Sequence, residues 1–140
     1  MMRAILLVLI IGDSLLAVSV GMIKKISGTV EVKRAKKILL AKEGELLENG
    51  DIILTKSKSS VGIVFDDGTR VSLGEKAIFL IKKFKVDPDK KDYDVDLELK
   101  KGKAVFSSGK IGKLSPKSVK FRIPTGIIGI RGTKFAVEAN

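Results

Sequence analysis

The chain has 140 residues, a formal net charge of +11 and no Cys or His. This length allows one domain with a real core, and a hydrophobic content of 44% excludes a disordered or low-complexity chain. Without Cys and His there is no thiolate nucleophile, imidazole base, or nitrogen or sulfur metal ligand. We therefore expect no enzyme activity, no metal site and no cofactor, and the enzymatic alternatives that stay open are carboxylate and serine–lysine chemistry.

Residues 1–19 have the pattern of a secretory signal peptide. A basic start and an apolar segment are followed by the small residues Ala17 and Ser19, which predict cleavage before Val20. An uncleaved membrane anchor is the alternative, and it is the only link to a membrane that we expect. Because both interpretations export the body, residues 20–140, we expect a periplasmic or secreted protein.

The body alternates apolar and polar residues over short stretches, which is typical of half-buried strands. We expect strands, or short apolar runs that form strands, at 20–26, 29–33, 38–41, 46–47, 52–55, 60–65, 71–73, 77–86, 95–99, 104–106, 119–123 and 127–137. Turns are expected at Asn49-Gly50-Asp51, whose residues tolerate positive φ, and at Lys101-Gly102-Lys103, and a loop is expected at 107–118. No stretch has convincing helical spacing, so the sequence predicts a single all-β domain, for which a sandwich, a jelly roll and a solenoid of short strands all stay open.

The segment from Ser60 to Leu73 predicts a hairpin. A two-residue loop would place the two apolar sets on opposite faces of the hairpin. A three-residue loop, 66–68, with Gly68 in the left-handed conformation, instead places Ile63 opposite Val71 and keeps one face apolar. We expect this second register.

The basic body favours anionic partners, which outside the cytoplasm are glycans, lipid phosphates or acidic protein surfaces. Nucleic acid is not expected, because the lysine runs contain almost no aromatic residues on which bases could stack. The carboxylate clusters at 66–67 and 87–96 are expected to form turns and solvated strand surfaces. Arg131, between Gly129 and Gly132, either ties main-chain carbonyls together or faces a ligand.

Several of these segments, taken in order, resemble the FecR domain family. The resemblance rests on the Gly50-Asp51-Ile52-Ile53-Leu54-Thr55 block, on Asp67-Gly68-Thr69 after an alternating strand, on Gly102-Lys103-Ala104, and on Gly129-Ile130-Arg131-Gly132-Thr133 with Phe135. It covers most of the span from residue 28 to 137. Gly126 stands where the family often has alanine.

The resemblance implies a non-enzymatic FecR-like β domain, residues 20–140, with β-helix-like or solenoid-like stacking of short strands. It also implies a cell-envelope binding or signalling module that acts through protein contacts. A basic surface-adhesion domain that binds an anionic glycan or lipid is the alternative, so the expected partner is an envelope protein or an anionic envelope polymer. The family-signature residues, structural or partner-binding, are Gly50, Asp51, Thr55, Asp67, Gly68, Gly129, Arg131, Gly132 and Thr133.

Overall fold

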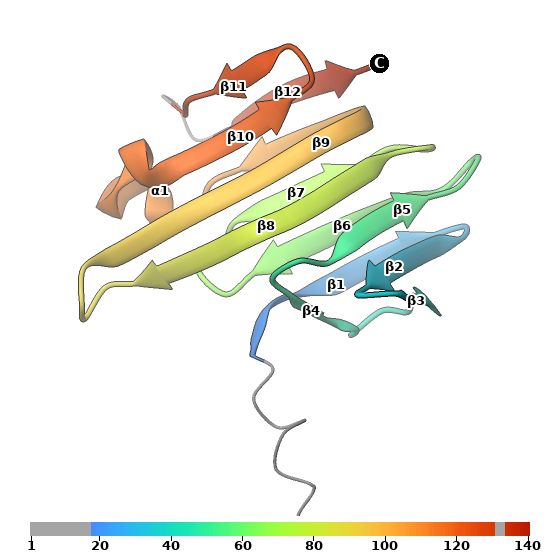
Figure 1. Cartoon of the computed structure of the whole chain (residues 1–140), viewed down its shortest axis with the longest axis horizontal. Helices are drawn as coiled ribbons and strands as arrows, with labels where there is room; N and C mark the ends of the chain where they lie inside the picture. Colours follow the sequence, from blue (N-terminus) through green and yellow to red (C-terminus); the bar gives the residue numbers. More distant parts are fainter. Residues whose placement is uncertain (1–17, 131–133) are drawn as a thin grey trace, which may run out of the picture.

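The computed structural model describes residues 18–130 and 134–140 and consists mainly of β-strands, as the sequence predicts (Figure 1). The strands are β1 (Ser19–Ser27), β2 (Val30–Arg34), β3 (Lys37–Leu40), β4 (Leu46–Glu48), β5 (Ile52–Thr55), β6 (Ser60–Phe65), β7 (Arg70–Leu73), β8 (Ile78–Asp87), β9 (Asp92–Ser107), β10 (Val119–Ile123), β11 (Gly126–Ile128) and β12 (Lys134–Ala139). A short helix, α1 (Ile111–Leu114), and one 3-10 turn, η2 (Pro116–Ser118), lie between β9 and β10. The predicted signal peptide lies almost entirely outside the described residues, so its cleavage stays a prediction.

The strands form one curled sheet in the order β3-β2-β5-β8-β9-β7-β6-β1-β4, with β10, β11 and β12 attached beside β9. All described pairs are antiparallel except β9–β10. We call β1, β4, β6, β7, β12 and the C-terminal part of β9 half A. The remaining strands, with the N-terminal part of β9, are half B. The solenoid-like stacking and the sandwich or jelly-roll alternative are not confirmed and stay predictions.

Strand β9 joins the two halves, and this corrects one expectation. The sequence predicts a turn at Gly102, but β9 runs through this residue without reversing. Gly102 has φ +101°, and a Cβ added there would lie 2.7 Å from the Cα of Ala77. A residue without a side chain is required at this bend, where β9 passes from β8 to β7.

The hydrophobic core lies between the inward faces of the two halves. Phe65 of half A stacks on Phe84 of half B with ring centroids 4.2 Å apart, and Phe106 meets Phe121 edge to face at 5.9 Å. All four rings are buried. Burying a phenylalanine side chain contributes about 1.5–3 kcal/mol each, so these cross-half contacts hold the curl of the sheet.

The predicted hairpin register is confirmed. Ile63 lies opposite Val71, the loop is 66–68, and Gly68 has φ +91°. The expected loop at 107–118 is only partly correct, because it contains α1 and η2. Ile111 in α1 is fully buried, and this anchoring side chain explains why a short helix forms where the sequence shows no helical period.

Candidate functional site

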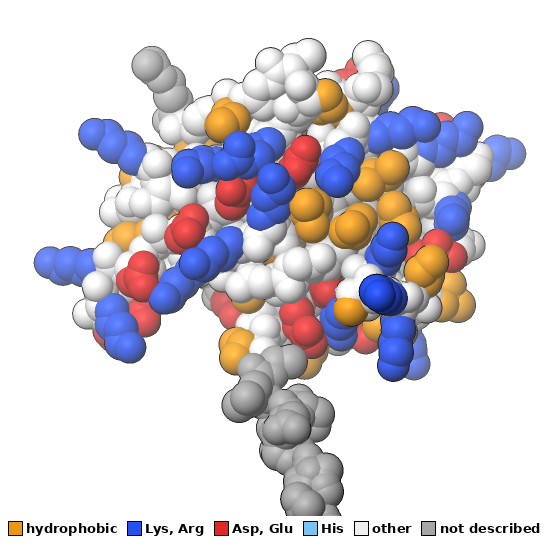
Figure 2. Space-filling model, viewed as in Figure 1, with side chains coloured by type: hydrophobic (Ala, Val, Ile, Leu, Met, Phe, Trp, Pro, Cys, Tyr) orange, Lys and Arg blue, Asp and Glu red, His pale blue; other side chains and the backbone are white. Residues whose placement is uncertain are grey.

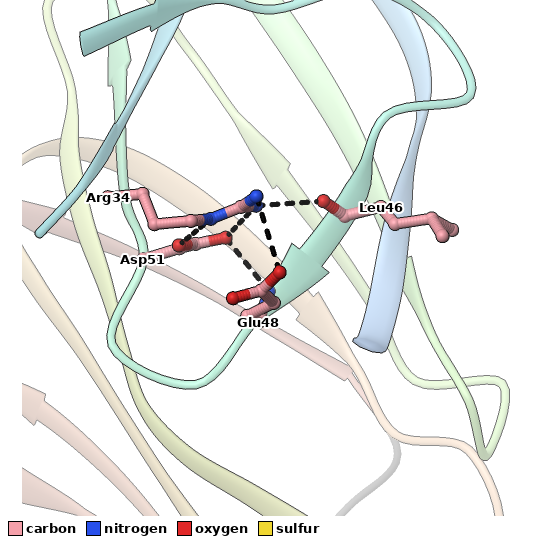
Figure 3. Close-up of polar contacts among 4 residues, drawn as sticks. All are labelled: Arg34, Leu46, Glu48 and Asp51. Carbon is pink, nitrogen blue, oxygen red and sulfur yellow. Dashed lines mark hydrogen bonds and ion pairs between the residues drawn. The ribbon is translucent and has the colours of Figure 1, made fainter. Parts of the chain in front are cut away.

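The signature residues Gly50 and Asp51 lie in the turn between β4 and β5 (Figure 3). Gly50 adopts φ +93°, as expected for this turn, and its N–H donates to the carbonyl of Ile81 at 2.6 Å. The Asp51 carboxylate is buried and accepts two hydrogen bonds from Arg34, from Nε at 2.9 Å and from Nη2 at 2.8 Å. It also accepts the main-chain N–H of Glu48 at 2.8 Å.

Arg34 is the centre of this cluster. Besides Asp51, it donates from Nη2 to the carbonyl of Leu46 at 3.0 Å, and its Nη1 lies 3.3 Å from Oε2 of Glu48. The hydrogen bond to Asp51 raises the pKa of Arg34 above its ordinary value. A bidentate guanidinium–carboxylate pair that also binds main chain fixes the geometry of the strands it joins, here β2, β4 and β5. The cluster is therefore an internal tether.

Thr55, at the end of β5, makes a second tether. Its hydroxyl donates to the carbonyl of Gly74 at 2.6 Å and accepts the N–H of Ala77 at 2.8 Å. The residue is buried. Both hydrogen-bonding directions of the hydroxyl are used within the chain, so Thr55 holds the segment between β7 and β8 against β5.

Asp67 and Gly68 form the third tether, at the β6–β7 loop. The Asp67 carboxylate accepts the N–H of Thr69 at 2.8 Å and the N–H of Ile111 at 2.9 Å. Gly109 lies against this loop, because a Cβ added there would be 2.3 Å from the Asp67 carbonyl oxygen. The loop and the start of α1 are thus locked together over a sequence distance of more than forty residues.

The last signature segment follows β11. No atom of the residues that the structure describes lies within 4 Å of a Cβ built on Gly129. Arg131, Gly132 and Thr133 lie outside the described residues, and whether Arg131 is structural or faces a ligand stays a prediction. The described signature residues sit at separate turns and do not converge on one cleft. Within residues 18–130 and 134–140 no cluster of three acidic side chains offers a metal site.

This chain is similar to one family model and to one solved structure. A family model described as "FecR protein" matches residues 51–140, which is more than half of the chain. The chain belongs to the FecR family. One solved structure, a "Cell surface anchoring domain", is similar with 34% sequence identity and a TM-score of 0.41, covering 43% of this chain and 80% of that one. No curated protein matches the chain.

In this FecR domain, sequence reasoning missed the partners of the carboxylates. Arg34 belongs to a basic run and gives no signal of its own, yet it holds Asp51. Arg122 in β10 likewise pairs with Asp96 in β9, from Nε to Oδ1 at 2.7 Å. Only the rarity of arginine among many lysines marks these two residues, because arginine forms bidentate pairs and lysine does not.

The outer face of half B carries a group of exposed and partly exposed apolar side chains. Ile52 lies opposite Leu80 and Leu54 opposite Ile78 across β5 and β8. At the sheet edge, β3 adds Ile38, and Figure 2 shows hydrophobic side chains gathered over β5 and β8. We call the following six residues the apolar face: Ile38, Leu40, Ile52, Leu54, Ile78 and Leu80.

In the described part of the chain, no helix is long and apolar enough to cross a membrane. The carboxylates of 92–98 lie along β9 and form ion pairs with cations of β8 and β10. They are thus used as the sequence predicts for a solvated strand surface.

Proposed function

We propose that this FecR-family chain is a non-enzymatic cell-envelope module, exported to the periplasm or beyond, that binds or relays a signal through contact with another envelope protein. The observation that carries the proposal is the apolar face on half B. Ile38 is 60% exposed and Leu40 69% exposed, at the edge of the sheet. Exposed apolar residues that form a continuous patch mark protein contact sites, whereas scattered ones do not.

The apolar face extends over β3, β5 and β8, and β2, which lies between β3 and β5, contributes Glu31 and Lys33 to it. Leu54 and Ile78 are directly opposite each other, and on its other side Leu54 is followed by Glu31 of β2 and then Leu40 of β3. Glu31 is paired with Lys56 at 3.1 Å, so this row presents apolar side chains with one neutralised charge between them. The neighbouring row has the exposed Lys33 between Ile38 and Ile52, and among the described residues no carboxylate forms an ion pair with it. A partner that packs here needs an apolar surface that also accommodates this lysine.

The non-enzymatic part of the proposal draws support from the tethers. Asp51, Thr55 and Asp67 each direct their side-chain oxygens at main-chain or arginine groups of the chain itself. A catalytic carboxylate instead needs a polar atom aimed at a substrate position.

Site-specific photocrosslinking tests the protein contact. A photoreactive phenylalanine analogue is placed at Leu40, and a matched one at Leu114, an exposed leucine in α1 away from the apolar face. In envelope preparations from the source cells, irradiation should yield one discrete adduct to a second protein from position 40 and none from position 114. Because the contact is apolar, the yield should be little affected by added salt.

Two results would overturn the proposal. Equal adducts from both positions would mean that the apolar face is not selective, and absence of any adduct at position 40 would mean that it has no partner. If position 40 crosslinks to another copy of this chain, the apolar face is a contact between two copies and not a contact with a different envelope protein.

A further inference from the structure

The outer face of half A, across the core from the apolar face, holds a shallow cationic groove. Its volume is about 360 Å³, and it crosses β1, β6 and β7. The side chains that supply its charge are Lys24, Lys25 and Arg70, and Ser72 adds a hydroxyl.

An irregularity in β1 places the two lysines together. Ile23 lies opposite Ile63 and Lys25 opposite Gly62, so β1 has one residue more than β6 between these pairs. Such a bulge breaks the alternation of the strand, and both Lys24 and Lys25 are exposed and line the groove. The bulge therefore concentrates two charges where a regular strand would present one.

Gly62 makes the hollow beneath these lysines. It is the residue of β6 opposite Lys25 on one side and Ser72 on the other. The closest atom to a Cβ built on Gly62 is Cβ of Lys25 at 4.0 Å, so a side chain would fit there without strain. The hollow exists because this position has no side chain. A side chain at position 62 would occupy the hollow and make the groove shallower.

The groove continues along the strands. A second depression shares Lys25, Gly62 and Ser72 with the first and extends past Ser27 and Ser60. The joined path is elongated and lined by hydroxyls and cations. This shape suits an extended polar chain better than a compact anion.

The cations of the groove lack the acidic partners that half B provides. On half B, five cations form an ion pair with a carboxylate: Lys56, Lys82, Lys83, Lys85 and Arg122. Among the described residues, no ion pair includes a side chain of β1, β6 or β7. Glu43 lies near the end of β1, but its carboxylate accepts the N–H of Ile26 at 3.0 Å.

We propose that this groove binds a linear acidic polysaccharide, a second activity on the face opposite the protein contact. The cations supply charge complementarity, and the serine hydroxyls suit sugar hydroxyls. A nucleic acid would need exposed aromatic rings on which its bases could stack. Five phenylalanines are instead buried in the core: Phe65, Phe79, Phe84, Phe106 and Phe121. A bilayer would need several apolar side chains to insert, whereas the groove is lined by Gly62, Gly68 and Ser72, with Val64 as its one partly exposed apolar side chain.

Calorimetric titration with polygalacturonate, and with neutral dextran as the uncharged comparison, tests the groove. In the first variant Lys24, Lys25 and Arg70 are all changed to Gln, and Kd for polygalacturonate should rise about tenfold at physiological ionic strength. The matched control changes the exposed Lys90, Lys113 and Lys117 to Gln. The control also removes three positive charges, but at positions away from the groove, and it should alter Kd by about twofold or less.

Gly62→Val separates shape from charge. It fills the hollow without altering net charge and should weaken binding by about tenfold, with Gly62→Ala intermediate and an unchanged circular dichroism spectrum as the folding check. Equal losses in both triple variants, or unaltered binding in Gly62→Val, would reduce the effect to general charge and overturn the proposal. So would absence of binding to polygalacturonate, or stronger binding to phosphatidylglycerol vesicles. The Leu40 crosslink should survive in every groove variant, so the two proposals fail independently.

Discussion

The carboxylates of the first and third tethers, Asp51 and Asp67, and those of the β8–β9 hairpin are the same chemical group in two settings. Asp51 and Asp67 are buried and accept main-chain N–H groups, while Asp92 and Asp94 are about half exposed and meet only lysine ammonium groups. A buried carboxylate that loses its partner is costly, whereas an exposed ion pair contributes little. The family signature therefore falls on acids that fix the chain, whereas Asp92 and Asp94 neutralise lysines of β8.

The comparison also accounts for where free charge is left. The acids of β9 lie on half B, so the lysines of β8 are neutralised and those of β1 are not. A net charge of +11 is thus not spread evenly over the molecule. One face is suited to an apolar contact and the other to an anion, and the four substitutions below test the carboxylates from the most to the least enclosed.

Asp51→Ala should have the largest effect. It removes both hydrogen bonds to Arg34 and the bond from the Glu48 N–H. Arg34 then keeps only Glu48 and the Leu46 carbonyl, and the Glu48 N–H loses its acceptor. The free energy of unfolding should therefore fall by about 3 kcal/mol, measured by urea denaturation. Asp89→Ala, in the exposed turn after β8, is the control and should change it by less than about 0.5 kcal/mol. Equal values for the two would mean that the tether does not hold the sheet.

Asp67→Asn should have a smaller and more local effect. The amide keeps one acceptor oxygen, so it can serve the Thr69 N–H or the Ile111 N–H but not both. A loss of about 1–2 kcal/mol is expected. Amide hydrogen exchange should accelerate at Ile111, with the amides of β2 and β5 affected only by the global loss. Uniform acceleration at all sites beyond that loss would contradict a local lock.

The sequence predicts the parts of this fold that depend on neighbouring residues. The β6–β7 register follows from the alternation of Ile63 and Val71 together with one glycine, because a shift by one residue would expose the apolar set. The turn at Gly50 follows from a similar local rule. These features need no knowledge of the rest of the chain, and the structure confirms them.

What the sequence does not predict depends on distant partners. Nothing near Asp67 indicates that it binds the N–H of Ile111, and nothing near Arg34 indicates that it closes on Asp51. Gly102 shows the same limit, because glycine between lysines is typical of a turn as well as of the bend in β9. The groove also depends on pairing, since Lys24 and Lys25 meet Gly62 only through a bulge.

The Asp96–Arg122 pair is less buried than Asp51 and less exposed than the Lys85–Asp92 pair, and its contribution to stability can be tested by changing pH. The hydrogen bond from Arg122 holds the pKa of the Asp96 carboxyl below its ordinary value of about 3.9. The folded state thus binds this proton less readily than the unfolded state, so the pair stabilises the fold above about pH 4 and loses this contribution as pH falls through the lower, folded pKa. The difference in unfolding free energy between wild type and Asp96→Asn should therefore shrink below about pH 4. A difference that stays constant down to about pH 2 would show that the effect of Asp96 is not its charge.

Lys85→Gln should have the smallest effect of the four. Lys85 and Asp92 are 45% and 48% exposed, so water screens the pair whose hydrogen bond lowers the pKa of Asp92. Removing the ammonium group should let the pKa of Asp92 return toward about 3.9, measured by carboxyl carbon NMR titration, while the unfolding midpoint stays close to wild type. The pKa reports that the pair forms, and the midpoint reports how much the fold depends on it. A fall in the midpoint as large as that of Asp67→Asn would end the distinction between enclosed and exposed carboxylates, because a solvated pair would then matter as much as a buried one.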